Sequence, residues 1–224
     1  MDLKQIKETA IAMLWLPIGE NEFSPMIVDH PFLESGMVPY QGELRNIFED
    51  DDAMQDVLKN YLEMIQDAKD LETIFLLLRK PYYFVFLKFI EDNLTRQEFS
   101  YFLGYVWTES ENPNQDVNVS VEEATEMFKR SEKEFLMLPE ELIMYKRLPN
   151  ELEVYRGVAT GRNPDGLSWT NSLSTAKWFS QRWQQGGYIR KGVVKKEKIL
   201  SYFNRRDENE LVISPKDIRN LGIL

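Results

Sequence analysis

The segment LEVYRGV, Leu152–Val158, decides the fold class, because the chain changes character there. Its valines, tyrosine and alternating apolar positions are typical of a strand. The residues just before it, LPEELIMYKRLP at 138–149, still have a helical pattern. On either side of this segment, the sequence predicts helices before about residue 148 and strands after it. We therefore expect an α+β protein.

Apolar spacing predicts helices through most of the first 147 residues. In residues 52–70 the apolar side chains recur every three or four positions, which favours an amphipathic helix. Residues 82–94, YYFVFLKFIEDNL, are apolar nearly all round and predict a buried helix. Two further helix starts carry capping boxes, formed by Thr95 with Glu98 and by Ser120 with Glu123.

Two segments of this part predict irregular structure. Residues 19–42 contain three prolines and three glycines, so we expect loops or short turns. Residues 108–119, TESENPNQDVNV, predict a polar loop between two helices.

The remaining segments predict a β-rich part at 148–224. Short strands are expected in DGLSWTN, GGYIRKGVVKK, ENELVI and NLGIL. Ser174 is expected to cap a helix whose inner face carries Ala176, Phe179 and Trp183. The expected domains are a helical, acidic part at 1–147 and the β-rich part at 148–224, which we expect to pack as one continuous fold.

The net charge of −10 is unevenly distributed. Residues 1–150 hold 14 Lys+Arg against 29 Asp+Glu, whereas residues 151–224 hold 13 against 8. The basic residues are densest in Arg190–Lys198 and at Arg205–Arg206. A cationic C-terminal part suits an anionic ligand such as a phosphorylated cofactor or nucleic acid. Packing of an acidic part against a basic part is an equally good explanation.

Several classes of function are disfavoured by what the sequence lacks. There is no cysteine, and His30 is the single histidine, so no His/Cys spacing typical of a metal site exists and we expect no metal. We expect His30 to lie in a surface turn. Neither phosphate-binding glycine motif is present. The first residues do not match a secretory signal and no run is long enough to span a bilayer, so we expect a cytoplasmic protein without membrane contact.

Three motifs of the β-rich part carry polar groups that suggest chemistry. Arg156 lies inside an apolar strand, where its permanent charge requires an anion or a salt bridge. Ser168 and Thr170 share one face of a short strand. Glu208 and Glu210 are expected to share one face at the start of a later strand, where two like charges are unfavourable without a function.

In this order, VYRG, SWT with its following helix, and ENELVI, the motifs resemble the arginine–serine–glutamate class of mono-ADP-ribosyltransferases with a Glu-x-Glu motif. The resemblance covers the last third of the chain and leaves the helical part unexplained. It implies a split β-sandwich that binds NAD as a substrate. The size resembles a bacterial toxin or a phage-encoded modifier acting in the host cytosol.

The resemblance also implies a role for each motif residue. Glu210 would stabilise the developing positive charge on the ribose, and Glu208 would hold an arginine acceptor on a protein. Arg156 would bind the cofactor, and Ser168 would orient Glu210. Tyr155, Gly157 and Thr170 would complete the NAD site. Further candidates for contact with the acceptor are Tyr202, Phe203, Arg205 and Arg206. Three aromatic residues are candidates either for contact with nicotinamide or for the core, namely Trp169, Phe179 and Tyr188.

Three alternatives stay open at this point. The same chemistry directed to nucleic acid is compatible with the basic residues but opposed by the acidic first part. Transfer to water would make the protein an NAD glycohydrolase, which needs Glu210 and tolerates loss of Glu208. A non-catalytic acidic binding module would leave the combination of Arg156, Ser168 and the two glutamates unexplained.

Overall fold

The computed structural model of the chain describes residues 1–24, 26–182 and 186–224. It is a mixed structure of helices and antiparallel sheets, which confirms the expected α+β class. The chain divides into two compact units, residues 1–95 and residues 96–224. Trp183, expected on the inner face of a helix, lies outside the described residues.

The first unit combines helices with two small sheets. Its helices are α1 (Leu3–Leu14), α2 (Asp51–Asp67), α3 (Leu71–Leu77) and α4 (Tyr83–Ile90), with single turns η1 (Lys80–Tyr82) and η2 (Glu91–Asn93). The expected buried helix is α4, which buries Tyr83, Phe84, Phe86, Leu87 and Ile90. Its rings pack with α3, where Phe75 lies edge-on to Phe86 at 5.4 Å between centroids.

The expectation that residues 19–42 form loops is corrected by the structure. Two antiparallel pairs involve this segment, β1 (Gly19–Glu20) with β2 (Val28–Asp29) and β3 (Met37–Tyr40) with β4 (Glu43–Asn46). Gln41 and Gly42, at φ 49° and 83°, form the two-residue turn between β3 and β4. Left-handed residues at both turn positions match the twist of paired strands, so this turn favours a hairpin.

His30 is buried instead of lying in a surface turn. Its Nδ1 accepts the backbone N–H groups of Phe32 and Leu33, both at 3.2 Å, and its Nε2 lies 3.2 Å from the carbonyl oxygen of Leu14. Two donors at Nδ1 require the tautomer that carries its proton on Nε2. Burial lowers the pKa of His30, which keeps the ring neutral and in a structural role.

The whole net charge belongs to the first unit. Residues 1–95 contain 8 Lys+Arg against 18 Asp+Glu, while residues 96–224 contain 19 of each. The helical residues 96–150 of the second unit are acidic as well, with 6 Lys+Arg against 11 Asp+Glu, but the basic β-rich part at 151–224 balances them.

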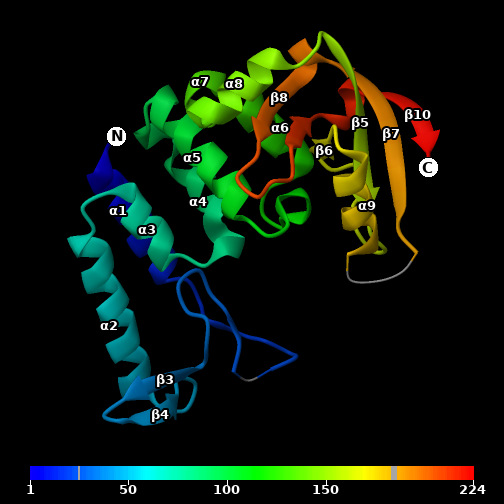
Figure 1. Cartoon of the computed structure of the whole chain (residues 1–224). Helices are drawn as coiled ribbons and strands as arrows, with labels where there is room; N and C mark the ends of the chain where they lie inside the picture. Colours follow the sequence, from blue (N-terminus) through cyan, green and yellow to red (C-terminus); the bar gives the residue numbers. More distant parts are fainter. Residues whose placement is uncertain (25, 183–185) are drawn as a thin grey trace. The chain divides into compact units, whose positions relative to one another are not determined.

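The second unit contains one six-stranded antiparallel sheet and the remaining helices. The strands are β5 (Glu151–Val158), β6 (Ser168–Thr170), β7 (Tyr188–Lys195), β8 (Ile199–Phe203), β9 (Glu210–Ile213) and β10 (Arg219–Ile223), in the spatial order β10-β7-β5-β6-β9-β8. The helices are α5 (Arg96–Glu109), α6 (Val121–Arg130), α7 (Lys133–Leu136), α8 (Pro139–Arg147) and α9 (Leu173–Gln181). Figure 1 shows α9 against β5, and β10 beside β7 at one edge of the sheet.

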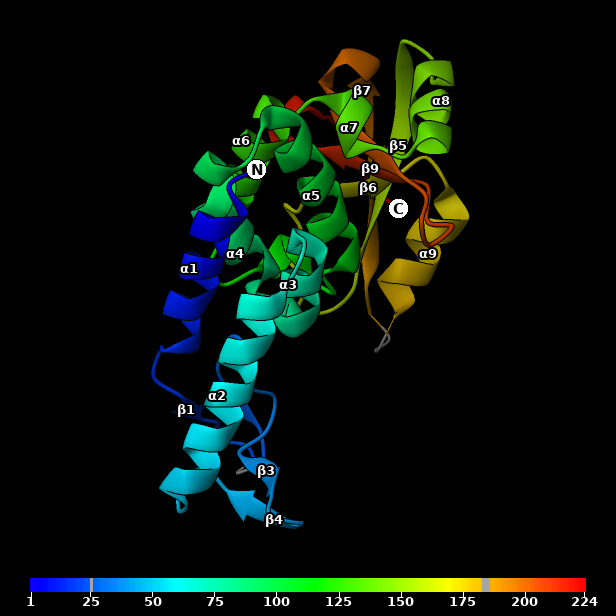
Figure 2. The ribbon, with the colours of Figure 1, turned by 90° about the vertical axis from the view of Figure 1, so that its left-hand side faces the viewer.

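Helices α5 to α8 share a core with the sheet, so the units do not divide at residues 147–148, where the sequence placed a boundary. Phe128 of α6 packs edge-on against Trp107 of α5 at 5.0 Å and lies 6.4 Å from Phe203 of β8. The backbone N–H of Tyr202 donates to Met137 Sδ at 3.4 Å. Helix α8, drawn near the top of Figure 2, contacts β8. The change of pattern near residue 148 marks a change of secondary structure inside one unit.

One predicted helix start is confirmed and another is displaced. Ser120 and Glu123 form the expected capping box at α6. For α9 the cap is Ser172, whose Oγ accepts the N–H of Thr175 at 3.2 Å, so the helix begins two residues earlier than expected. Ser174 lies in the first turn, where its hydroxyl contacts that of Ser172.

None of the described helices has both the length and the apolar character that a membrane crossing would require.

Candidate functional site

A cleft opens in the second unit between the sheet and the segment that follows α5. Its walls come from α5, the polar loop at 110–115, strands β5, β6 and β9, helix α9 and the loop between β8 and β9. All seven site residues expected from the sequence line it, namely Tyr155, Arg156, Gly157, Ser168, Thr170, Glu208 and Glu210.

Strand register places three of the expected residues in one row. Tyr155 of β5 pairs with Thr170 of β6, and Thr170 pairs with Glu210 of β9. Directly paired residues point to the same side of a sheet, and Ser168 shares the face of Thr170 because it lies two positions away. The sheet therefore presents Ser168, Thr170 and Glu210 on one face.

The carboxylate of Glu210 is held by two donors from different elements. Trp107 Nε1 donates to Oε1 at 3.0 Å, and the hydroxyl of Ser168, on the same face of the sheet, lies close enough to lower the pKa of Glu210. Burial nevertheless raises the pKa of Glu210; the two hydrogen bonds and Arg206 act against this rise, and Glu208 adds to it. Glu210 is therefore a desolvated carboxylate whose orientation is set by neutral donor groups.

Glu208 is positioned by a loop and not by strand alternation, which corrects the expectation that both glutamates begin β9. The strand begins at Glu210, and Asp207 and Asn209 have left-handed φ values of 55° and 48°. Thr170 Oγ1 donates to the carbonyl oxygen of Glu208 at 3.0 Å, which ties this loop to β6. Desolvation raises the pKa of the Glu208 carboxyl, and nearby arginines oppose the rise.

The loop that carries Glu208 is anchored to two helices. Glu141 of α8 is 2% exposed, and its Oε1 accepts the N–H of Asn204 at 2.9 Å. Arg205 donates to Thr108 Oγ1 of α5 at 2.9 Å, and Arg206 donates to the carbonyl oxygen of Thr108. These bonds hold the loop against the end of α5, on the side of the cleft where Trp107 reaches Glu210.

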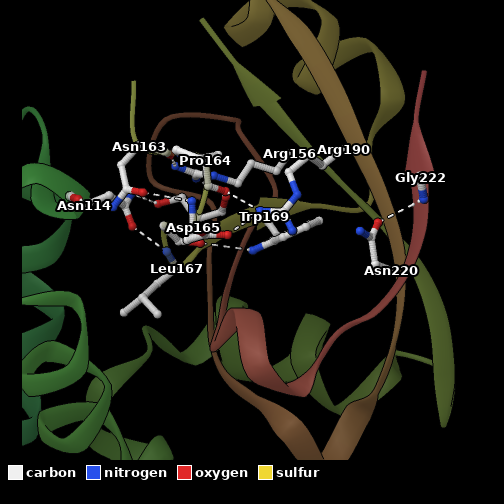
Figure 3. Close-up of polar contacts among 12 residues, drawn as sticks. Asn114, Arg156, Asn163, Pro164, Asp165, Leu167, Trp169, Arg190, Asn220 and Gly222 are labelled. Atoms are coloured by element: carbon white, nitrogen blue, oxygen red, sulfur yellow. Dashed lines mark hydrogen bonds and ion pairs between the residues drawn. The ribbon is translucent and has the colours of Figure 1, made fainter. Parts of the chain in front are cut away.

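Arg156 is buried in the cleft wall, at the point where β5 and β6 separate beyond their pairing at Tyr155 and Thr170. Its Nη1 donates to the carbonyl oxygen of Ser168 at 2.6 Å and its Nη2 to that of Asn163 at 2.7 Å, while its buried Nε has no hydrogen-bond partner among the described residues. Figure 3 shows the guanidinium among the loop residues 163–165. Burial lowers the pKa of Arg156 to about 10, and Glu210 opposes that shift, so the side chain stays charged at neutral pH.

Gly157 is required by the close approach of α9 to β5. A Cβ atom at this position would lie 2.0 Å from the carbonyl oxygen of Ala176. Tyr155, on the same strand face, uses its hydroxyl to bond Glu153 Oε2 at 2.7 Å. Tyr155 thus lines the cleft, but its hydroxyl bonds a carboxylate at the exposed end of the strand.

The aromatic candidates separate into core and cleft residues. Trp169 is 3% exposed, with Arg190 lying 5.7 Å from its ring centroid, so it is a core residue, although it also borders the cleft. Phe179 is half-buried and lines the cleft. Tyr202 is 2% exposed and donates its hydroxyl to Asn209 Oδ1 at 2.7 Å, so its expected role in acceptor contact is wrong.

The polar loop after α5 contributes site residues that the sequence pattern does not predict. Asn114 Nδ2 donates to Ser168 Oγ at 2.7 Å, and Asn114 Oδ1 accepts the N–H of Leu167 at 2.5 Å, as Figure 3 shows for Leu167. Arg162 Nη1 crosses to Asn112 Oδ1 at 2.8 Å and to Gln115 Oε1 at 2.9 Å. No local pattern marks these contacts, because each joins residues more than 40 positions apart.

The cleft is electropositive. Five arginines line it, Arg156, Arg162, Arg182, Arg205 and Arg206, against three glutamates, Glu111, Glu208 and Glu210. Arg156 and Arg162 bond neutral oxygens rather than carboxylates. An excess of fixed positive charge in a concave site favours an anionic ligand.

Comparisons with models of protein families, with curated proteins and with solved structures find no match for this chain.

Proposed function

We propose that the second unit is an NAD-dependent mono-ADP-ribosyltransferase that modifies an arginine side chain of a protein. The observation that carries this proposal is the convergence of Arg156, Ser168, Glu208 and Glu210 on one electropositive cleft. Three separate strands and a loop contribute these side chains. In this proposal, the split between β5 and β6 corresponds to the opening of the β-sandwich that the sequence resemblance implies.

The charge of the cleft lining supports NAD as the ligand. Its arginines suit a diphosphate. The unpartnered Nε of Arg156 leaves one buried donor unsatisfied, which is unfavourable without a ligand. Phe179 of α9 lines the cleft and supplies an apolar surface that suits a flat aromatic ring such as nicotinamide.

Transfer breaks the bond between the nicotinamide nitrogen and ribose C1′, with the electron pair leaving on nicotinamide, and forms a new bond from C1′ to a nitrogen of the acceptor. Glu210 would face the positive charge that develops at the ribose, as carboxylates do in glycoside hydrolysis. Ser168 and Trp107 hold this carboxylate in place. Arg156 maintains the cleft wall and supplies positive charge toward the diphosphate.

In this proposal, Glu208 holds the acceptor. It lies in the cleft on a loop anchored by Arg205 and Arg206, one residue from the strand that carries Glu210. A carboxylate there would pair with an incoming guanidinium and take the proton that its nitrogen loses.

The proposal is tested by incubating the wild-type chain and the Glu210→Ala and Glu208→Ala variants with labelled NAD and a cell lysate. We expect label in the protein fraction for the wild type and a loss on the order of 100-fold for Glu210→Ala. Glu208→Ala should lose protein label while still releasing nicotinamide, because water can replace the arginine. Label in nucleic acid would contradict the assignment of a protein acceptor. Intact NAD in every sample would refute the proposed enzymatic activity.

A further inference from the structure

The direction of the hydrogen bonds around Ser168 is fixed by a backbone group. The N–H of Leu167 can only donate, so the atom of Asn114 that faces it at 2.5 Å must be Oδ1. The other end of the same amide, Nδ2, is then the atom that faces Ser168 Oγ at 2.7 Å. The orientation of Asn114 therefore follows from the fold and leaves no ambiguity between its oxygen and its nitrogen.

This orientation determines what the Ser168 hydroxyl does. An amide nitrogen only donates, so Ser168 Oγ accepts from Asn114 and keeps its single proton for another partner. Ser168 pairs with Val212, two positions from Glu210, so the two side chains are diagonal neighbours on one face of the sheet. The carboxylate of Glu210 is therefore the partner that we infer for this proton, in agreement with the lowering effect of Ser168 on the pKa of Glu210. A directed chain of hydrogen bonds thus runs from Asn114 through Ser168 to Glu210, and Trp107 donates to the same carboxylate from α5.

We propose that Asn114 is a positioning residue that, through Ser168, stabilises the ionised form of Glu210. The proposal deepens the proposed function and rests on it only where activity is concerned. It also gives the polar loop at 110–115 a role, since this loop carries into the cleft the one group that orients Ser168.

The local packing shows that Asn114 is built into this place. A Cβ atom on Gly166 would lie 2.7 Å from Asn114 Cγ and 2.4 Å from Arg156 Nη2, so a glycine is needed where the two side chains meet. Asn163 Nδ2 donates to the carbonyl oxygen of Asn114 at 3.3 Å and holds its backbone. Side chain and backbone of Asn114 are both held.

Other charged groups near Glu210 also influence its titration. Arg156 comes from β5, while Glu208 and Arg206 come from the loop before β9. None of them bonds Asn114 in the described structure. A change at Asn114 that preserves its shape should therefore act on Glu210 through Ser168.

The test is Asn114→Asp in the full-length protein, with the Glu210 carboxyl followed by carbon-13 NMR across pH. The aspartate keeps an acceptor for Leu167 but cannot donate to Ser168, so the hydroxyl turns toward it and leaves Glu210. We expect the midpoint of the Glu210 titration to rise by about one pH unit, a tenfold change in its ionisation equilibrium. Asn118→Asp, an exposed position of the same segment, is the matched control and should leave the midpoint unchanged.

A second variant separates the relay from a simple charge effect. In a Ser168→Ala background, Asn114→Asp should shift the titration by much less, since the connecting hydroxyl is gone. An equal shift with and without Ser168, or no shift at all, would overturn the proposal, as would a loss of thermal stability in Asn114→Asp without any change in titration.

The titration uses no NAD, so its outcome is independent of the proposed enzyme. Where the wild type releases nicotinamide, Asn114→Asp should lower kcat about tenfold below the new midpoint, restore it at higher pH and leave KM unchanged. Absence of activity in the wild type would refute the proposed function. The role of Asn114 would then be tested by the titration alone.

Discussion

Glu210 combines two properties that oppose each other. Its carboxylate is desolvated, which disfavours ionisation, and it accepts hydrogen bonds from Trp107 and Ser168, which favour it. A folded protein gains little stability from such a group, because a neutral side chain would fit the same place at lower cost. The arrangement is explained by a requirement for negative charge in the cleft.

The variant Glu210→Gln should therefore lose activity and gain stability. The folded-state pKa of Glu210 lies above its unfolded value, so the folded wild type binds more protons and loses stability as the pH rises through that interval. The variant does not titrate there. Differential scanning calorimetry should show the melting temperature of the variant exceeding that of the wild type by more at pH 8 than at pH 4.5. A difference that is independent of pH would contradict the raised pKa.

At the scale of elements, the contact between α9 and β5 shapes one wall of the cleft. It depends on Gly157, where a side chain would collide with the helix backbone at Ala176. The same contact places Phe179 of α9 in the cleft. Backbone atoms in the middle of a helix yield little, so we expect the helix itself to move when this glycine is replaced.

Gly157→Ala is expected to destabilise the second unit by about 1–3 kcal/mol, as overpacking does, and to raise KM for NAD by displacing Phe179. Gly192→Ala on β7 is the matched control. A Cβ atom there would meet the end of the Ile218 side chain at 2.3 Å, outside the cleft, so stability should fall with KM unchanged. Urea unfolding and steady-state kinetics measure both effects, and an unchanged KM in Gly157→Ala would contradict the role of α9.

For the whole molecule, charge and site are divided between the two units. The first unit carries the net charge of −10, and the second, with balanced charge, contains every residue that lines the cleft. Under the proposed function, we expect the acidic unit to be dispensable for NAD binding. It would be suited to selecting a basic partner protein.

Deleting residues 1–95 should therefore leave NAD cleavage intact. The fragment 96–224 is expected to fold cooperatively and to release nicotinamide with the KM of the full chain, while modification of the protein acceptor declines. Circular dichroism and the two activity assays test this together. A folded fragment without affinity for NAD would show that the first unit contributes to the site.

The sequence was informative where function depends on strand pattern. Strand alternation correctly placed Ser168 and Thr170 on one face, and the order of motifs brought Arg156 and Glu210 to the same cleft. The sequence pattern did not predict features of the site that depend on local backbone conformation or on contacts between distant residues. The left-handed conformation of Asn209 removes Glu208 from the strand, and the contacts of Asn114 with Ser168 and of Trp107 with Glu210 join residues 54 and 103 positions apart.

Helix and strand patterns also could not locate the division into units. The hydrophobic residues of α5 to α8 show that these helices need a partner, but not that the partner is the sheet rather than α1 to α4. That choice depends on packing such as Phe128 against Trp107 and Phe203, which has no local signature.

The most direct measurement is nicotinamide release from NAD by the wild-type chain beside Glu210→Gln, which keeps the shape of the side chain and removes its charge. The account predicts release by the wild type and a reduction on the order of 100-fold in the variant, with NAD binding retained. Equal release by both proteins, or none by the wild type when its fold is verified, would contradict the assignment of the cleft as an NAD-cleaving active site.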